Sequence, residues 1–297
     1  MNKIGLHNAY WLDTEMVDAG VYKWMELAKQ ANCEVMEIGT AEIVAMTNAE
    51  RLEFKKAVAD AGMILTINDG FTKDDDIAAE DPAVRRRGIE RAKRILQAMY
   101  ELGADRWSGI NYSEWLRHPE VATCTPDFKA HVRDLSLESM REIIKTAEDC
   151  GVDYCFEVVN RFEQFLLNTA AEGVQFCEDL GSPRAKLLLD TFHMNIEEDN
   201  IADAIKFAQS KGRLGHIHVG ESNRRVPGFE GKTNMDWDAI MGAVKESGYE
   251  GYIIMEPFMK MGATTICCWR DMSHGADIAT MVGYAKDGAA FLRSKLA

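Results

Sequence analysis

Eight short runs rich in apolar residues repeat along this chain of 297 residues, and each is followed by a longer segment with helical periodicity. The predicted strands are residues 3–7, 35–39, 63–67, 106–110, 154–159, 186–190, 214–219 and 252–256. The predicted helices are residues 16–31, 48–61, 82–102, 126–149, 169–180, 201–210, 236–247 and 278–294. Strict alternation of strands and helices predicts a parallel sheet covered by helices.

The ends of the predicted helices carry the expected signals. Residues with capping side chains come near the helix starts, at Thr47, Asp81, Thr125, Thr169 and Asp236. Glycines follow the helix ends at Gly62, Gly103, Gly151, Gly181, Gly212 and Gly248. Eight such units predict an α/β fold of the (β/α)8 TIM barrel type, for which about 250 residues is typical.

A doubly wound open sheet is the alternative architecture. No Gly-x-Gly-x-x-Gly motif follows the first predicted strand, so a dinucleotide-binding fold gains no support. We found no linker or low-complexity segment, and we expect one barrel domain over residues 1–297. Two longer insertions, at residues 71–79 and 112–125, follow the third and fourth predicted strands, and they are expected to lie over the barrel mouth.

Charge and cysteine content limit the partners of the chain. The formal net charge is −14 at pH 7, which disfavours a surface that neutralises phosphates and therefore excludes a nucleic-acid partner. No apolar run approaches the roughly 18 residues of a membrane span, so no membrane partner is expected. The seven cysteines form no Cys-x-x-Cys pair and are expected to be reduced and buried. We expect a soluble, cytoplasmic protein.

Four consecutive predicted strands, the fifth to the eighth, end in or near side chains that can bind a metal ion. These side chains are Glu157, Asp190, His218 and Glu256. The strand ends converge at the mouth of a barrel, where three carboxylates repel one another unless a cation or protons neutralise them. The ligand set favours a fairly hard divalent ion such as Mn²⁺, Mg²⁺ or Co²⁺, and Zn²⁺ stays open. Taken alone, Asp190 would instead cap the helix that follows it.

Other polar residues near the strand ends are candidates for the same site. His216 and His218 are two positions apart and face the same side of their strand, so we assign His218 as the ligand and His216 to a deeper position. His193 follows the sixth strand and is either a substrate contact or a surface histidine. Glu163 and Arg224 lie on loops after strands and, on spacing alone, are solvated charges.

Several of these residues lie in segments that resemble one known family. The segments are residues 157–163 (EVVNRFE), 189–198 (LDTFHMNIEE), 220–228 (GESNRRVPG) and 255–258 (MEPF). They resemble the ketose 3-epimerases, the D-tagatose 3-epimerase and D-psicose (D-allulose) 3-epimerase family of xylose-isomerase-like barrels, and the resemblance covers most of the chain. It implies a metal-dependent isomerase, usually with Mn²⁺, that inverts C3 of free ketoses such as D-tagatose, D-fructose/D-psicose or L-ribulose. It also implies a homodimer or homotetramer.

The resemblance assigns roles to individual residues. It implies the same four metal ligands that the strand ends suggest, namely Glu157, Asp190, His218 and Glu256. It places Glu163, His193, Arg224 and the loop aromatic Trp115 at the substrate. The hydrogen at C3 of a ketose is α to the C2 carbonyl, so a cation bridging O2 and O3 would stabilise the cis-enediolate formed when that hydrogen leaves. Glu157 and Glu256 would then act as the catalytic acid and base on opposite faces of the sugar.

Three segments depart from the family pattern and concern the choice of sugar. The chain has His7-Asn8 where aromatic residues are usual, so we expect a more polar pocket with His7 at the substrate. It has Asn68-Asp69 after the third strand, and its loop at residues 110–116 also differs. Two other functions remain open, an aldose-ketose isomerase on the same barrel and a non-catalytic sugar-binding protein.

Overall fold

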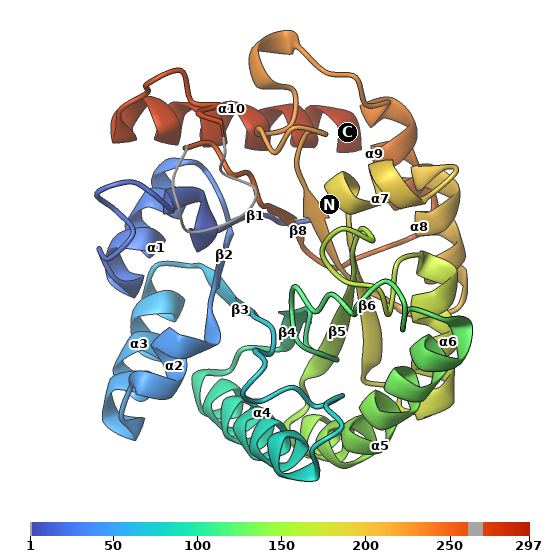
Figure 1. Cartoon of the computed structure of the whole chain (residues 1–297). Coiled ribbons are helices and arrows are strands. Elements are labelled where there is room, and N and C mark those ends of the chain that lie inside the picture. The colour runs from blue at the N-terminus through green and yellow to red at the C-terminus, as the bar shows by residue number, and fades with distance from the viewer. Residues whose placement is uncertain (1, 261–269) are drawn as a thin grey trace.

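The computed structural model describes residues 2–260 and 270–297, and within them the strands form a closed barrel (Figure 1). The strands are β1 (Ile4–His7), β2 (Val35–Ile38), β3 (Ile64–Asn68), β4 (Arg106–Gly109), β5 (Asp153–Val158), β6 (Ala185–Asp190), β7 (Leu214–Val219) and β8 (Ile253–Met255). They pair in parallel in sequence order, and β8 pairs with β1. The closed pairing confirms the (β/α)8 barrel, because a doubly wound sheet would keep two open edges.

Helices surround the barrel, as Figure 1 shows. They are α1 (Val21–Gln30), α2 (Thr40–Ala45), α3 (Asn48–Asp60), α4 (Pro82–Leu102), α5 (Pro126–Cys150), α6 (Ala170–Leu180), α7 (Thr191–Glu197), α8 (Ile201–Ser210), α9 (Trp237–Glu246) and α10 (Ile278–Leu296), with 3-10 turns at η1 (Asn8–Trp11) and η2 (Phe229–Gly231). The predicted caps are confirmed, since each of the five side chains accepts a hydrogen bond from the first turn of its helix. Gly103, Gly151 and Gly181 end their helices in the left-handed conformation that glycine adopts readily.

Two short helices were not predicted, and most element boundaries differ from the prediction by one or two residues, the start of the first helix by five. The helices α2 and α7 have six and seven residues, too few for a helical period to stand out. The first helix begins at Val21 rather than residue 16, because Gly20 directly before it has φ of 83°. Strand β8 ends at Met255, so Glu256 is the first residue beyond the strand.

The strand ends approach one another closely where the barrel opens. Gly109, the last residue of β4, has φ of 124°, and a Cβ atom at this position would lie 2.3 Å from the carbonyl oxygen of Asp69. Only glycine combines this backbone conformation with such an approach. The loops after β3 and β4 are therefore held together at the point where they leave the barrel.

The two predicted insertions lie against each other at the mouth. Phe71 and Glu114 form an isolated parallel bridge, and the Trp115 backbone N–H donates to the Phe71 carbonyl at 2.9 Å. Farther out, Arg117 donates to the Asp76 carboxylate at 3.0 Å. Phe71 and Trp115 both line the cavity at the barrel mouth, as expected for these insertions.

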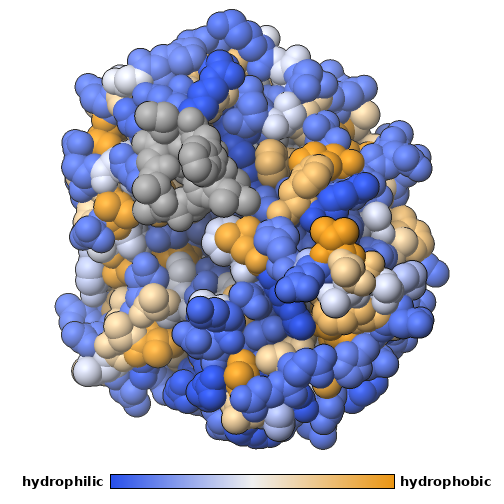
Figure 2. All heavy atoms as spheres, viewed as in Figure 1, coloured by the Kyte–Doolittle hydropathy of each residue, from blue (hydrophilic) through white to orange (hydrophobic). Residues whose placement is uncertain are grey.

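The face seen in Figure 2 is mostly hydrophilic, with hydrophobic side chains in small separate patches. Among the described helices, none has both the length and the apolarity that crossing a membrane requires. The five described cysteines are all free thiols, and Cys33, Cys155 and Cys177 are buried as expected. Cys124 is exposed, contrary to that expectation, and Cys267 and Cys268 lie outside the described residues.

Candidate metal centre and active site

A cavity of about 310 Å³ opens at the carboxyl ends of the strands, a size suited to a small-molecule ligand. It is lined by seven of the predicted site residues, namely His7, Trp115, Glu157, Glu163, His193, Arg224 and Glu256. The two remaining predicted residues, Asp190 and His218, have no exposed surface and lie next to these lining residues. The structure therefore brings together every site residue that the sequence pointed to.

The four candidate ligands come from four adjacent strands. Glu157 lies near the end of β5, Asp190 and His218 are paired across β6 and β7, and Glu256 directly follows β8. One ligand atom from each of the four lies within 4.8 Å of the others. This convergence follows from the parallel barrel, because neighbouring strands end at the same edge.

Arg224 supplies positive charge to this acidic cluster. Its Nη1 donates to Asp190 Oδ2 at 2.6 Å and to Glu256 Oε2 at 3.0 Å. The guanidinium carbon lies 3.9 Å from the ring centre of Phe192 and 5.0 Å from that of Phe258, so two aromatic rings fix its plane. The interpretation of Arg224 and Glu163 as solvated charges is therefore wrong, since each residue is only 5% exposed.

The two carboxylate oxygens of Asp190 make different contacts. Its Oδ1 accepts a hydrogen bond from the Phe192 backbone N–H at 2.9 Å and so caps α7, while its Oδ2 faces the cluster and Arg224. The helix cap is confirmed, and it does not exclude the ligand role, which stays a prediction. A carboxylate has enough lone pairs for both roles.

His193 belongs to a buried network on the wall of the cavity. Its Nδ1 accepts from the Asn160 backbone N–H at 3.2 Å, and the Asn160 side-chain amide also contacts Glu163 Oε1 at 3.1 Å. Trp115 closes the network, because its indole N–H donates to Glu163 Oε2 at 3.2 Å. The His193 Nε2 lies 3.5 Å from Glu157 Oε1, so the alternative of a surface histidine is wrong.

Electrostatics displaces the pKa values of the two predicted catalytic carboxyl groups in opposite directions. Burial and the nearby charge of Glu256 raise the pKa of Glu157, although a hydrogen bond from His193 opposes them. Burial alone would raise the pKa of Glu256, but the charges of His218 and Arg224 outweigh it and lower that pKa below its usual range. Carboxyl groups with separated pKa values are typical of a site that needs both an acid and a base.

The residues of the cluster fit a divalent cation. His218 Nδ1 is buried without a hydrogen-bond partner among the described residues, and it lies 3.5 Å from Glu256 Oε2. Three carboxylates and one imidazole are the donors that Mn²⁺, Mg²⁺ and similar ions use. The cluster can therefore hold a divalent metal ion, and nothing in its geometry selects one ion among these.

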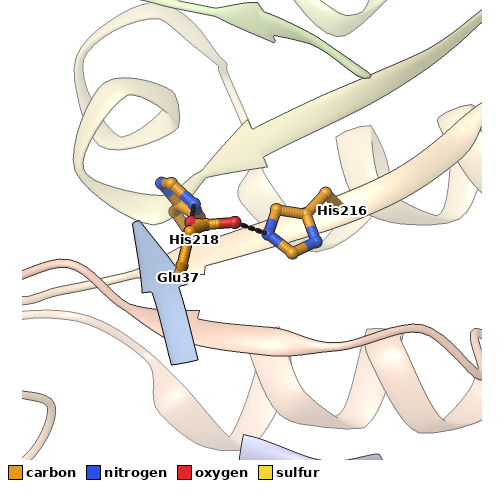
Figure 3. Close-up of side chains that lie close together, drawn as sticks. All are labelled: Glu37, His216 and His218. Atoms are coloured by element: carbon orange, nitrogen blue, oxygen red, sulfur yellow. Dashed lines mark hydrogen bonds and ion pairs between the residues drawn. The ribbon is translucent and has the colours of Figure 1, made fainter. Parts of the chain in front are cut away.

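Sequence reasoning missed Glu37, a fully buried acid in β2. Figure 3 shows its carboxylate between the imidazoles of His216 and His218. The carboxylate oxygens lie 2.6 Å from His218 Nε2 and 2.8 Å from His216 Nε2. His216 thus lies deeper than His218, as predicted. The available signal was an acid inside the apolar strand Val35–Ile38, where a buried charge requires partners.

The closed barrel and the acidic, metal-competent cluster at its mouth place this protein among the (β/α)8 barrel proteins with a candidate metal site at the strand ends. Residues 25–294 match the model of the xylose isomerase-like TIM barrel family, and the chain belongs to that family.

Its relatives include D-psicose 3-epimerases. The D-psicose 3-epimerase of Agrobacterium fabrum is 40% identical over 294 residues, with 98% of both chains covered. That of Ruminiclostridium cellulolyticum is 38% identical over 278 residues, covering 93% of this chain and 91% of its own. A solved structure of D-psicose 3-epimerase with D-tagatose, from Clostridium cellulolyticum H10, superposes with a TM-score of 0.90 at 36% identity over 99% of both chains. These relatives confirm the family resemblance and the isomerase class.

Proposed function

We propose that this protein is a metal-dependent ketose 3-epimerase that inverts C3 of a free ketose by deprotonation and reprotonation. The observation that carries the proposal is the set of three buried carboxylates and one imidazole whose ligand atoms lie within 4.8 Å of one another in the barrel mouth. Its similarity to D-psicose 3-epimerases along nearly the whole chain supports the same reaction.

In this proposal Glu157, Asp190, His218 and Glu256 hold a divalent ion, for which Mn²⁺ is the first choice and Co²⁺ or Mg²⁺ are alternatives. Bound there, the ion supplies Lewis-acid stabilisation of the negative charge that develops on the sugar oxygens. The charge of Arg224, shared between Asp190 and Glu256, keeps the carboxylates oriented beside the ion.

Glu157 and Glu256 carry the proton transfers. They enter the cavity from strands three positions apart in the barrel, so a sugar lying between them presents opposite faces of C3 to the two carboxylates. One carboxylate removes the C3 proton, and the other delivers a proton to C3 from the opposite face. Each positioned acid or base contributes roughly 10²- to 10⁴-fold to the rate.

The remaining cavity residues bind and orient the sugar. Glu163 and His193 present fixed polar atoms on one wall, because Asn160 and Trp115 hold them in place. Arg224 is a candidate donor to the sugar oxygens near the reacting centre.

His7 adds a donor at the opposite side. Its Nδ1 accepts from the Ala9 backbone N–H at 2.9 Å, which places the proton of the neutral ring on Nε2. That Nε2 is buried without a partner among the described residues, and His7 lines the cavity. We assign it to a sugar hydroxyl. Asn68, Asp69 and Thr72 line the same cavity and make a polar ketose, of the D-tagatose, D-fructose/D-psicose or L-ribulose class, the expected substrate.

A panel of ketoses assayed with Mn²⁺ and then with a chelator tests the function, with C3 configuration followed by NMR in deuterated water. We expect metal-dependent inversion at C3 and incorporation of deuterium at C3. Deuterium at C1 with formation of an aldose would show an aldose-ketose isomerase instead. Binding of a sugar with no turnover under any metal condition would show a sugar-binding protein.

The biological setting belongs to the same proposal. We expect a homodimer or homotetramer, a cytoplasmic location and a single barrel domain over residues 1–297. Light scattering of the purified protein measures the first of these. Limited proteolysis tests the last, since one domain should resist cleavage into two stable fragments.

A further inference from the structure

Glu37 lies outside the four candidate ligands and outside the cavity lining, yet it touches one of those ligands directly. It is fully buried in β2, and its Oε1 lies 2.6 Å from His218 Nε2. Its Oε2 lies 2.8 Å from His216 Nε2 and accepts a weaker hydrogen bond from Ser108 Oγ at 3.3 Å (Figure 3). Three donors from β4 and β7 thus converge on one carboxylate.

The consequence for His218 concerns which ring nitrogen carries a proton. A carboxylate offers only acceptors, so each ring nitrogen that faces Glu37 must carry hydrogen. The other nitrogen of His218, Nδ1, faces the acidic cluster at 3.5 Å from Glu256 Oε2. A nitrogen must be free of its proton to ligate a metal ion, and a carboxylate on the far side of the ring fixes both the tautomer and the ring orientation.

We propose that Glu37 is a positioning residue that holds His218 in the Nε2–H tautomer and aims its Nδ1 at the metal centre. This inference rests on the proposed function, because it takes Glu157, Asp190, His218 and Glu256 as the ligands. In this role Glu37 increases the affinity of the protein for the metal ion by orienting His218, although Glu37 is neither one of the four candidate ligands nor part of the cavity lining.

A second metal ion between Glu37, His216 and His218 is the competing explanation, since their ligand atoms also lie within 4.8 Å of one another. The distances argue against it. An ion holding a carboxylate oxygen and an imidazole nitrogen at about 2.1 Å each keeps those atoms about 3 Å or more apart. The observed separations of 2.6 and 2.8 Å are those of hydrogen bonds.

The test compares Glu37→Leu with the control His216→Leu, which disturbs the same buried cluster but leaves Glu37 against His218. Mn²⁺ affinity and stoichiometry are measured by calorimetry on the whole protein. We expect Glu37→Leu to weaken Mn²⁺ binding roughly 10- to 100-fold, and the control to stay within about threefold of the parent. Equal losses in both variants, no loss in Glu37→Leu, or two ions per parent chain would overturn the role of Glu37.

Glu37→Gln keeps the volume of the side chain and gives a second readout if Glu37→Leu fails to fold. Its amide oxygen can accept a hydrogen bond from only one imidazole, and its NH₂ group donates to the other. In Mg²⁺-loaded protein, imidazole ¹⁵N NMR should show the His218 proton still on Nε2 and the His216 proton moved to Nδ1. Both protons remaining on Nε2 would overturn the inference. A parent protein that binds no divalent ion would instead overturn the proposed metal centre itself.

Discussion

Replacing Glu256 by glutamine separates the two steps of the proposed inversion, the removal of the C3 proton and the delivery of a proton to the opposite face of C3. The amide in Glu256→Gln would keep the side-chain volume but could not take or give the C3 proton. Arg224 would remain anchored by its 2.6 Å hydrogen bond to Asp190. Loss of one acid/base group costs roughly 10²- to 10⁴-fold in turnover, which is about 3–5 kcal/mol of activation free energy at 1.36 kcal/mol per tenfold. We therefore expect net epimerisation to fall by at least about a hundredfold.

The same variant should still exchange one hydrogen. Because Glu157 remains, Glu256→Gln should exchange the C3 hydrogen of one ketose epimer with deuterated water without inverting it. Glu157→Gln should exchange that of the other epimer. The assay is proton NMR on each purified epimer, with the metal content measured in parallel so that a lost ligand is distinguished from a lost base.

Glu246→Gln is the matched control, because Glu246 forms an ion pair with Lys206 on the surface and its side chain is 68% exposed. Its turnover should equal that of the parent. Near-normal epimerisation by Glu256→Gln, or exchange of the same epimer by both active-site variants, would refute the assignment of the two carboxylates to opposite faces.

Three further predictions concern stability. Chelation should lower the melting temperature and Mn²⁺ should restore it. At a free Mn²⁺ concentration of one hundred times Kd, the ion should add about 2.7 kcal/mol to the free energy of unfolding. An unchanged melting curve would contradict a bound ion. Gly109→Ala should cost about 2–4 kcal/mol in urea unfolding, because its Cβ would meet the Asp69 carbonyl at positive φ, whereas Gly242→Ala in open space should not destabilise. A hydrogen bond from Arg86 lowers the pKa of Glu142 from 4.5 to about 2. The ionised Glu142 therefore adds to the free energy of unfolding above pH 4.5, and this stabilisation is lost as the pH falls towards 2. Glu142→Gln should accordingly lower the urea midpoint at pH 7, with the difference shrinking below pH 4.5; a constant difference would contradict the ion pair.

The barrel was predictable because its signals are local. Helix α4 was predicted at its observed bounds, Pro82–Leu102, since the Asp81 cap, the proline after it and the Gly103 stop all act within one turn of the helix ends. The four candidate ligands were predictable for a related reason. A parallel barrel gathers consecutive strand ends at one edge, so adjacency in the strand order becomes adjacency in space.

The contacts that the sequence did not reveal join residues far apart in the chain. Glu37 meets His216 and His218 across 179 and 181 positions, and no periodicity encodes that pairing. Arg224 lies on a loop after β7, has φ of 61° and donates a hydrogen bond to Asp190. A pattern of apolar residues does not predict this backbone conformation. The partner of a buried acid therefore depends on which strands and loops the folded barrel brings next to it.

The double use of Asp190 links the candidate ligand cluster to the wall of the cavity. One oxygen faces the candidate ligand cluster and the other anchors the first turn of α7, which carries His193 on the cavity wall. Ions of different radius hold carboxylate oxygens at different distances, so exchanging the ion at the proposed site would move the anchor of that turn and, with it, the imidazole of His193. A change of ion at the proposed site would then reach the sugar-binding wall of the cavity through the seven-residue helix α7.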